Sequence, residues 1–353
     1  MKKVFTVFLV MFFVVSSSGA SAKPGSDLLS RIKEAQEVLS KSNMSAGCGA
    51  KSHVCRSGKD FEKSNVILAV SCSSPRIHQV RLLSDRNKSG KYLFERGDAN
   101  GVNTTFTVMK PKGCMVLAQK RPVSLSNGRF SEVVYTAYSS AIDTPEIRQQ
   151  GMRYLVKTID NAHEALYKKG VISRPYHRRL VAGTVPPWVA VRLALVEHID
   201  PARLQNESMR QLVNEVQVVI GVNGANAYRY SVSDAGARGI LQITPHTYEL
   251  IRSSYTTARL KKDFIEGTRD PVNAAQATVL LFDLDTETLS REKRLILLHD
   301  GLRRMEYLAA AYNGGSGRAE KAMRADGSLA LAELPLETQG YIYKLRGVHD
   351  VLR

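Results

Sequence analysis

Residues 233–248 are the part of the chain whose residue types and spacing say most about chemistry, and they read SDAGARGILQITPHTY. The stretch starts with a polar run at Ser233 and contains two glycines, Gly236 and Gly239, with a small residue between them. Glycine adopts backbone conformations that other residues resist and allows very close approach. The spacing therefore predicts a polar loop held tightly against another group, leading into an apolar segment that begins at Ile240.

Three further motifs follow this loop. Residues 270–273 read DPVN, residues 309–317 read AAAYNGGSG and residues 336–341 read LETQGY. With the loop, they resemble in sequence order the S-x-x-G-A-x-G-L-M-Q-x-x-P-x-T, D-P-x-x-N, A-A-Y-N-A-G-x-G and P-x-E-T-x-x-Y motifs of lytic transglycosylases related to goose-type lysozyme. The resemblance covers residues 185–343 and does not extend to the first half of the chain.

This resemblance implies a small helical, lysozyme-like domain with a glycan cleft. In the family, one glutamate acts as general acid and then as base on the β-1,4 bond between N-acetylmuramic acid and N-acetylglucosamine of peptidoglycan. The C6 hydroxyl of the muramic acid closes a 1,6-anhydro ring, so the enzyme is a lyase, and we expect no cofactor and no metal. The acid must be protonated near neutral pH, which requires an apolar site that raises its pKa.

The position of this glutamate is where the sequence departs from the family. The family's acid lies nine residues before the loop serine, and Gly224 occupies that position here. Our first hypothesis is Glu197, which ends an apolar helix and continues as HIDP, similar to the family's E-S-x-F-x-P shifted by one. The helix expected near Met209 would then be an insertion before the loop.

Two alternatives remain open. In the second hypothesis Glu215 is the acid, although it lies off the apolar stripe of its helix, where a solvated carboxylate would keep an ordinary pKa. In the third hypothesis the acid is missing. The domain would then be a catalytically inactive module that binds peptidoglycan or serves as a scaffold.

The resemblance also implies substrate-binding roles for six residues: Ser233, Gly236, Gln242, Tyr312, Asn313 and Tyr341. Structural roles are the alternative for most of them. Gln242 would be a polar residue at the edge of the core, and both tyrosines would be core residues with a satisfied hydroxyl group. Gly236 is needed for backbone geometry under either interpretation.

The elements that must position these residues are helical from Val185 onward. Pro186 and Pro187 open a segment that is apolar on nearly every side, which predicts a buried helix. Helical spacing of apolar residues recurs after Met209, after Asp270 and after Leu302. We therefore predict an all-helical second half.

The first half has another pattern. A short amphipathic helix over residues 28–39 precedes a stretch, residues 64–138, of short segments rich in β-branched and aromatic residues and separated by turn residues. Four cysteines lie in or beside this stretch: Cys48, Cys55, Cys72 and Cys114. An even number in an exported protein predicts two disulfides, with the pairing left open. The sequence thus predicts a β-rich, disulfide-containing domain.

The N-terminus has the pattern of a secretory signal peptide. A basic start is followed by an apolar run from Val4 to Val15 and by small residues that end in an A-x-A site at Ala22. An apolar run of this length is too short to span a bilayer as a helix. We expect cleavage after Ala22 and a periplasmic or secreted protein without a stable membrane anchor.

The chain is strongly basic. Its formal net charge is +17, and removal of the two lysines in residues 1–22 leaves +15. A charge of this size attracts polyanions, which outside the cell are the cell wall and anionic lipids. Nucleic acid is excluded as a partner because the protein is expected to be exported and the sequence has no nucleic-acid-binding motif.

These features predict an α+β protein with four regions. They are a signal peptide (1–22), a β-rich domain with a short N-terminal helix (23–142), a linking helix and loop (143–184), and a lysozyme-like lytic transglycosylase domain (185–353). We expect peptidoglycan glycan strands as the substrate. The β-rich domain would bind an envelope or secretion-assembly partner.

Overall fold

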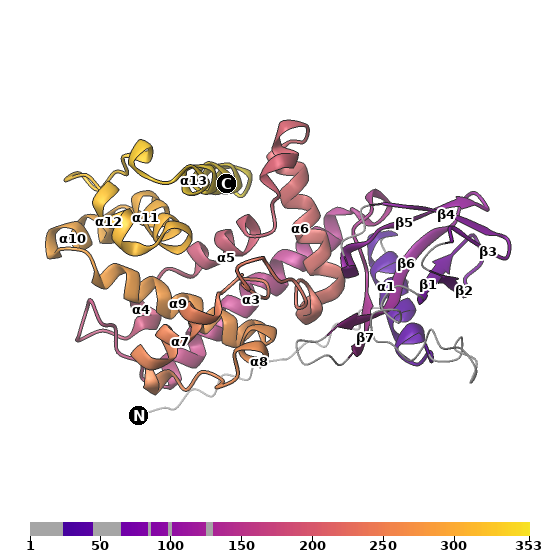
Figure 1. Cartoon of the computed structure of the whole chain (residues 1–353), viewed down its shortest axis with the longest axis horizontal. Helices are drawn as coiled ribbons and strands as arrows, with labels where there is room; N and C mark the ends of the chain where they lie inside the picture. Colours follow the sequence, from indigo (N-terminus) through magenta and orange to yellow (C-terminus); the bar gives the residue numbers. More distant parts are fainter. Residues whose placement is uncertain (1–23, 45–64, 84–85, 98–100, 125–129) are drawn as a thin grey trace, which may run out of the picture.

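The computed structural model describes residues 24–44, 65–83, 86–97, 101–124 and 130–353. Figure 1 shows a β-rich part at one end of the long axis and a helical part at the other. The predicted α+β class, with an N-terminal β-rich region and a C-terminal helical region, is therefore confirmed.

The described β-rich part contains two antiparallel sheets and one long helix. The four-stranded sheet has the order β2-β1-β6-β7, from Ile77–Leu83, Asn65–Ser71, Met115–Ser124 and Phe130–Tyr135. The three-stranded sheet has the order β3-β4-β5, from Lys88–Ser89, Tyr92–Arg96 and Phe106–Lys110. The helix is α1 (Pro24–Ser40), and a single 3-10 turn, η3 (Gly101–Asn103), precedes β5.

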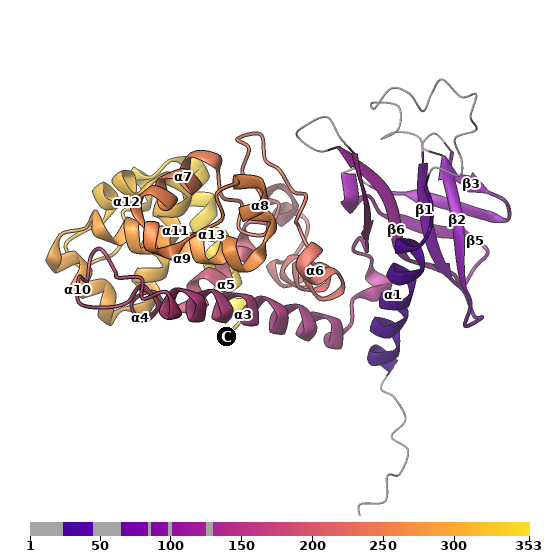
Figure 2. The same cartoon turned by 90° about the horizontal axis from the view of Figure 1, so that it is seen from below.

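Both faces of the four-stranded sheet are buried because β1 is apolar on both sides. Successive side chains of a strand point to opposite faces. Val66, Leu68 and Val70 pack in the core shared with the three-stranded sheet, whereas Ile67 and Ala69 pack in the core shared with α1. The sheet thus lies between α1 and the second sheet, as Figure 2 shows.

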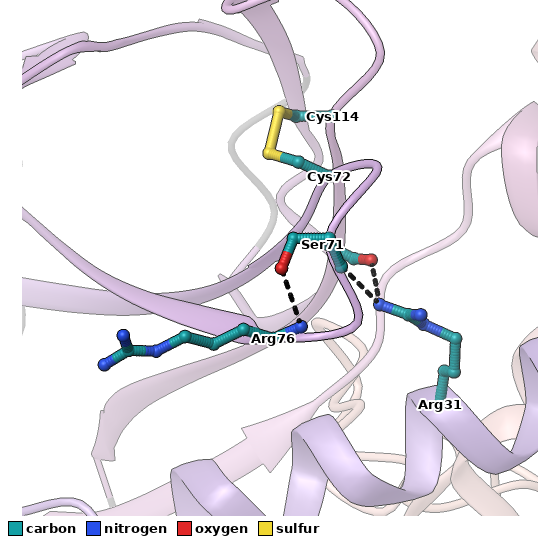
Figure 3. The surroundings of a disulfide bond; sticks show 6 residues. Arg31, Ser71, Cys72, Arg76 and Cys114 are labelled. Carbon is teal, nitrogen blue, oxygen red and sulfur yellow. Dashed lines mark hydrogen bonds between the residues drawn. A yellow bond between two sulfur atoms is a disulfide. The ribbon is translucent and has the colours of Figure 1, made fainter.

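A disulfide joins the two central strands of the larger sheet. Cys72 follows β1 and Cys114 precedes β6, and their sulfur atoms are bonded (Figure 3). Beside it, the Arg31 guanidinium of α1 donates to Ser71 Oγ at 2.5 Å, which ties the helix to the end of β1. Cys48 and Cys55 lie outside the described residues, so the pairing predicted for them remains a prediction.

The helical part consists of the following described α-helices: α3 (Pro145–Lys168), α4 (Val181–Thr184), α5 (Pro187–Val196), α6 (Met209–Asn223), α7 (Pro245–Ser254), α8 (Phe264–Arg269), α9 (Pro271–Glu287), α10 (Arg291–His299), α11 (Gly301–Gly314), α12 (Ser316–Ala322) and α13 (Leu336–Val351). Short 3-10 turns join them: η4 (Ser140–Ile142), η5 (Pro201–Gln205), η6 (Gly224–Asn226), η7 (Thr256–Ala258) and η8 (Leu331–Glu333). Searched over the described residues, no helix has the length and apolarity needed to cross a membrane.

Capping explains where several helices begin. Thr144 accepts a hydrogen bond from the backbone of Ile147 at the start of α3, and Asp270 accepts from two amides at the start of α9, with proline next in both cases. Nearly every residue of α9 is buried, so this helix forms the centre of the helical core. Side chains of α3 lie in both cores, with Ile147 beside α1 and Leu155 in the helical core. The predicted boundaries at 142 and 184 remain predictions.

Two glycines allow α3 and α6 to cross in backbone contact. A Cβ on Gly151 of α3 would lie 1.9 Å from Gln217 O, and a Cβ on Gly221 of α6 would lie 2.3 Å from Ile147 O. Both distances are far below van der Waals contact, so only glycine fits at this crossing.

Hydrogen bonds also join α6 to the β-rich part. The Asn223 carboxamide at its end accepts from Thr136 N at 2.9 Å and donates to Thr136 O at 2.8 Å, as a neighbouring peptide group would. Gln36 of α1 donates to both Val222 O and Thr136 Oγ1. The two parts of the molecule are therefore joined by directional hydrogen bonds as well as by the shared apolar core.

Candidate active site

Glu197 lies directly after the last residue of α5, the apolar helix of the helical core. Most of α5 is buried, including Val196 beside the glutamate. An acidic residue at a helix C-terminus is unfavourable because the carbonyl ends carry partial negative charge. The buried Lys344 of α13 offsets this cost, since its ammonium donates to Val196 O at 3.1 Å and to Ile199 O at 3.0 Å.

The carboxyl of Glu197 is held by a tyrosine from the far end of the chain. The Tyr341 hydroxyl of α13 donates to Glu197 Oε1 at 2.5 Å. Burial raises the pKa of Glu197 to about 7, while the hydrogen bond from Tyr341 and the charge of Lys344 oppose the rise without cancelling it. Near neutral pH a large fraction of this carboxyl is thus protonated.

Glu197 faces a cavity of about 370 Å³. On the helical side the cavity is also lined by His198, Tyr230, Ser233 and Gln242. Among the described residues that line it, Glu197 is the one carboxylate. The structure thus brings three of the residues singled out from the sequence, Glu197, Ser233 and Gln242, around one space.

Part of the cavity lining comes from the glycine-bearing loop, which forms a tight turn. Ser233 N donates to Ala237 O, and Ser233 Oγ accepts from Ala237 N. Gly236 and Gly239 both have φ of +77°, and a Cβ on Gly239 would lie 2.5 Å from Thr268 O. The loop therefore needs glycine at position 239 for its close approach to the end of α8.

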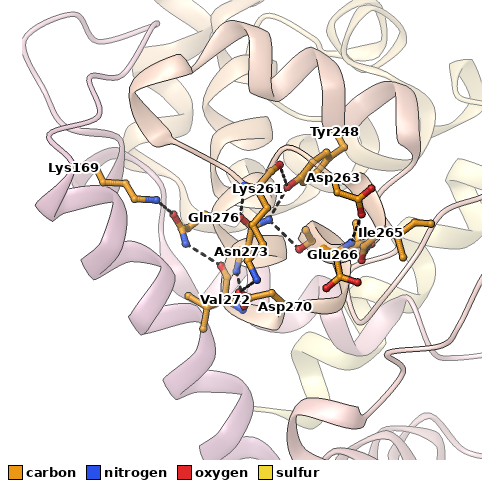
Figure 4. Close-up of polar contacts among 12 residues, drawn as sticks. Lys169, Tyr248, Lys261, Asp263, Ile265, Glu266, Asp270, Val272, Asn273 and Gln276 are labelled. Atoms are coloured by element: carbon orange, nitrogen blue, oxygen red, sulfur yellow. Dashed lines mark hydrogen bonds and ion pairs between the residues drawn. The ribbon is translucent and has the colours of Figure 1, made fainter. Parts of the chain in front are cut away.

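Asn273 of the DPVN motif holds the segment against which this loop packs. Its Nδ2 donates to Tyr248 Oη at 2.8 Å and to Gly267 O at 2.9 Å, and its Oδ1 accepts from Lys261 N at 3.0 Å (Figure 4). The carboxamide thereby joins α7, α8 and α9 around one buried point. Its position predicts a structural role, one step removed from the cavity.

Glu215, the second candidate acid, has entirely different surroundings. Arg203 binds both of its oxygens, with Nη1–Oε1 at 3.0 Å and Nη2–Oε2 at 2.7 Å, and also binds Glu207. These residues line a second cavity of about 490 Å³. Because both oxygens accept from a guanidinium, Glu215 is an acceptor in a structural ion pair.

Residues 224–334 match the family described as Transglycosylase SLT domain. The C-terminal half contains a lytic transglycosylase-like domain. This match confirms the resemblance read from the motifs, and it supports a peptidoglycan-acting function. No curated protein and no solved structure matches the chain. The matched range contains Ser233 and Gln242 but excludes Glu197 and Tyr341, so these two are placed by geometry alone.

Four of the six residues expected to bind substrate, Gly236, Tyr312, Asn313 and Tyr341, are not among the residues that line the cavity. Tyr341 contacts Glu197, and the other three support the lytic transglycosylase-like domain from outside the lining. The Tyr312 hydroxyl donates to Leu241 O, behind the loop. Asn313 accepts from Thr338 Oγ1 at 2.8 Å, which ties the end of α11 to α13. Gly236 provides the turn geometry. Their contacts are those of the structural alternative, and their predicted contact with substrate remains a prediction.

Gln242 has both a structural contact within the loop and a position at the cavity. Its backbone has a positive φ of +44°, and its carboxamide donates to Gly239 O at 2.7 Å, which stabilises the loop. It also lines the cavity. A strained backbone held at a cavity wall is a common feature of functional sites.

His198 was not predicted as a site residue. Its ring stacks on Tyr228 with centroids 3.5 Å apart and planes 5° apart, and its Nε2 lies 3.0 Å from Ile240 O. Burial lowers the pKa of His198 to about 3, so the ring is neutral over the working range of pH and donates from Nε2. It forms a flat wall and provides no acid beside Glu197. Only its place after Glu197 in the sequence could have signalled it.

A raised pKa alone would not identify the acid of this domain. Burial also raises the pKa of Asp285 of α9 to about 7, yet Asp285 lies in the core and does not line either cavity. Position relative to the cavity distinguishes Glu197. Among the described residues, no cluster of three metal-ligating side chains is present.

Proposed function

We propose that the protein is an exported peptidoglycan lytic transglycosylase in which Glu197 is the single acid and base. The observation that carries the proposal is the position of this carboxyl, which lines the same cavity as Ser233 and Gln242. The burial-raised pKa supports it, because a general acid works best when its pKa is near the working pH.

In the first step the protonated carboxyl of Glu197 donates its proton to the oxygen of the β-1,4 bond. The bond between C1 of N-acetylmuramic acid and that oxygen breaks, and positive charge develops at C1. Tyr341 contributes to this step because its hydroxyl holds Glu197 Oε1 and stabilises the carboxylate that remains after proton transfer.

In the second step the Glu197 carboxylate accepts the proton of the C6 hydroxyl of the same muramic acid. O6 then bonds to C1, which gives the 1,6-anhydro ring and returns Glu197 to its protonated state. A glycosidase that uses water has a second carboxylate about 5–9.5 Å from the acid. Among the described residues, the lining of this cavity contains no second carboxylate, whereas Asp200, Glu207 and Glu215 line the neighbouring cavity.

Export is the other part of the proposal. Its support is the signal-peptide pattern of residues 1–22 and a charge of +15 on the remaining chain, which would hold the protein near the anionic wall. A docking role of the β-rich domain toward an envelope or secretion assembly stays a prediction.

The test is product analysis. The purified protein without residues 1–22 is incubated with peptidoglycan sacculi, and soluble products are examined by mass spectrometry. We expect muropeptides ending in 1,6-anhydro-N-acetylmuramic acid. Reducing-end products would identify a hydrolase. Binding to sacculi without any product would favour the catalytically inactive binding module.

A further inference from the structure

The cavity at Glu197 has a second wall that comes from the β-rich part. Opposite the helical residues, the lining consists of η3 (Gly101–Asn103) and of Arg121, Pro122 and Val123 of β6. These residues lie outside the range that matches the transglycosylase family. Half of the cavity is thus built by a region to which neither the motifs nor the comparisons assign a role.

Asn103 is the polar side chain of η3 at this wall. It is half-buried and lines both the cavity at Glu197 and the second cavity beside Glu215. Within the described part of the chain its carboxamide makes no hydrogen bond. The amide therefore has a donor and an acceptor available at the place where the two cavities meet.

The backbone that carries Asn103 is rigidly held. The buried Gln119 of β6 donates from one Nε2 to Val102 O and to Thr104 O, both at 2.8 Å. Arg121 donates to Gly101 O and, at 3.0 Å, to Thr104 Oγ1. Two of these hydrogen bonds hold carbonyls of η3 itself and two hold Thr104 directly after it, so the backbone on both sides of Asn103 is tied to β6, as expected for a preorganised binding group.

The wall as a whole is also fixed relative to Glu197. The β-rich part is joined to α6 by the two hydrogen bonds between Asn223 and Thr136, and α6 crosses α3 in backbone contact at Gly151 and Gly221. His198 lines both cavities from the other side. Asn103 and His198 thus line both cavities, with η3 on one side and the helical part on the other.

We propose that the β-rich part is one wall of the glycan-binding channel and that Asn103 is a sugar-binding residue. Its carboxamide would hydrogen-bond the acetamido or hydroxyl groups of an N-acetylhexosamine unit next to the bond that Glu197 faces. An amide can donate to the acetamido carbonyl and accept from a hydroxyl at once, which suits a sugar bearing both groups. This inference rests on the proposed function, because it takes its substrate class from there.

The test measures binding separately from cleavage. In the full chain lacking residues 1–22, E197Q is the parent, and N103A and N103W are added to it. The matched controls are N161A and N161W in the same parent, because Asn161 is exposed on α3 and lines neither cavity. Titration calorimetry with a soluble N-acetylglucosamine hexamer and sedimentation with sacculi give the affinities, and thermal melting checks the fold.

We expect N103A to weaken hexamer binding about tenfold, the effect of one or two lost hydrogen bonds. N103W should weaken it further, since the new side chain would occupy the channel. The Asn161 controls should bind like the parent. Affinities of N103A and N103W within twofold of the parent would overturn the proposal, and so would a parent that binds neither glycan.

The two proposals fail in different ways. If unmutated protein releases no anhydro products but N103A still weakens glycan binding, the channel wall stands and the lytic activity does not. A second outcome is that the unmutated protein forms anhydro products and that N103A and N103W, made with Glu197 intact, cleave sacculi at the same rate. The lytic activity would then be supported, and the proposed role of Asn103 would be rejected.

Discussion

The end of α5 and the middle of α6 each present one glutamate toward a cavity, and they treat it in opposite ways. At the end of α5, Glu197 meets apolar packing, one tyrosine hydroxyl and a lysine that is already occupied by two carbonyls. On α6, Glu215 meets a guanidinium that grips both oxygens. The same carboxyl group is buried with a raised pKa in one place and is held as an ion-pair acceptor in the other.

The difference shows that burial and the nearest partner act together on a carboxylate, since burial raises the pKa of Glu197 whereas a guanidinium binds both oxygens of Glu215. A guanidinium satisfies a carboxylate as an anion, whereas a hydroxyl offers one hydrogen bond and no charge. The apolar pattern of the sequence favours Glu197 over Glu215, but only tertiary contact reveals their partners, Tyr341 and Arg203.

Exchange of the Glu197 or Glu215 carboxyl for an amide is the strongest test of the difference between the two sites. Glu197→Gln removes the only proposed proton donor, so we expect release of anhydro products from sacculi to fall about a thousandfold. Glu215→Gln should leave the rate within about threefold, as expected for a residue outside the chemistry. Equal losses in both variants would contradict the assignment of the acid. Initial rates by chromatography of muropeptides provide the measurement.

Stability as a function of pH should differ between the two sites. The pKa of Glu197 is about 7 in the folded protein against 4.5 as its ordinary value, so the folded state binds the proton more tightly. The stability gained from this proton is fully present below pH 4.5 and is lost as the pH rises through about 7. The lost contribution is on the order of 3 kcal/mol, from a pKa difference of about 2.5.

The comparison of Glu197→Gln with the unmutated protein isolates this contribution. The difference in free energy of unfolding should shift in favour of the variant between pH 4 and pH 8. Urea unfolding followed by circular dichroism measures it. The same series for Glu215→Gln is the control, and a shift of equal size there would show that the effect does not come from Glu197.

Lys344→Met tests whether the Lys344 ammonium stabilises the backbone at the end of α5. The variant leaves Val196 O and Ile199 O without their donor at the end of α5, and we expect the free energy of unfolding to fall by about 2 kcal/mol. Lys168→Met, which removes a largely exposed i,i+4 ion pair, should cost less than about 0.5 kcal/mol. Thermal or urea unfolding of both variants decides the matter, and equal losses would contradict the proposed capping.

Tyr341→Phe should produce the smallest change and test the hydrogen bond directly. Since this bond lowers the pKa of Glu197, its loss should move the alkaline limb of kcat/KM to higher pH. The maximal rate should fall about tenfold, because the carboxylate formed in the reaction loses a donor. Tyr343→Phe, on an exposed residue of the same helix, is the control. An unmoved limb would mean that Tyr341 does not act on the acid.

Much of the helical half could be predicted from the sequence because its signals are local. Proline and capping residues mark the starts of α3, α5 and α9, and the glycines of residues 233–248 predict the tight loop that the structure contains. The choice of Glu197 as the acid, which remains a prediction, used its place after an apolar helix and the similarity of the following residues to the family's motif. These inferences need only neighbouring residues.

The rest depends on contacts between distant residues. The β-rich character of residues 64–138 was predicted, but the order of the strands in the sheets was not. In β6, Gln119 and Lys120 interrupt the apolar pattern, and they are accommodated because they donate to backbone carbonyls in and after η3 and after α1. Tyr341 and Glu197 are 144 residues apart in sequence. Tertiary packing decides which helix end faces which loop. The strand and helix periodicities of the sequence, 2 and 3.6 residues, do not contain that information.

The crossing of α3 and α6 fixes the distance between these two helices. Two peptide backbones in van der Waals contact cannot move closer, and at Gly151 and Gly221 no side chain holds them apart. The distance between α3 and α6, and with it the position of the β-rich part that Asn223 joins to α6, is therefore determined by main-chain atoms. A single methyl group added at either glycine would clash with the facing backbone, so α6 and the β-rich part joined to it would have to shift relative to α3. If the proposed glycan site is correct, a change this far from the sugar would alter the space available to it.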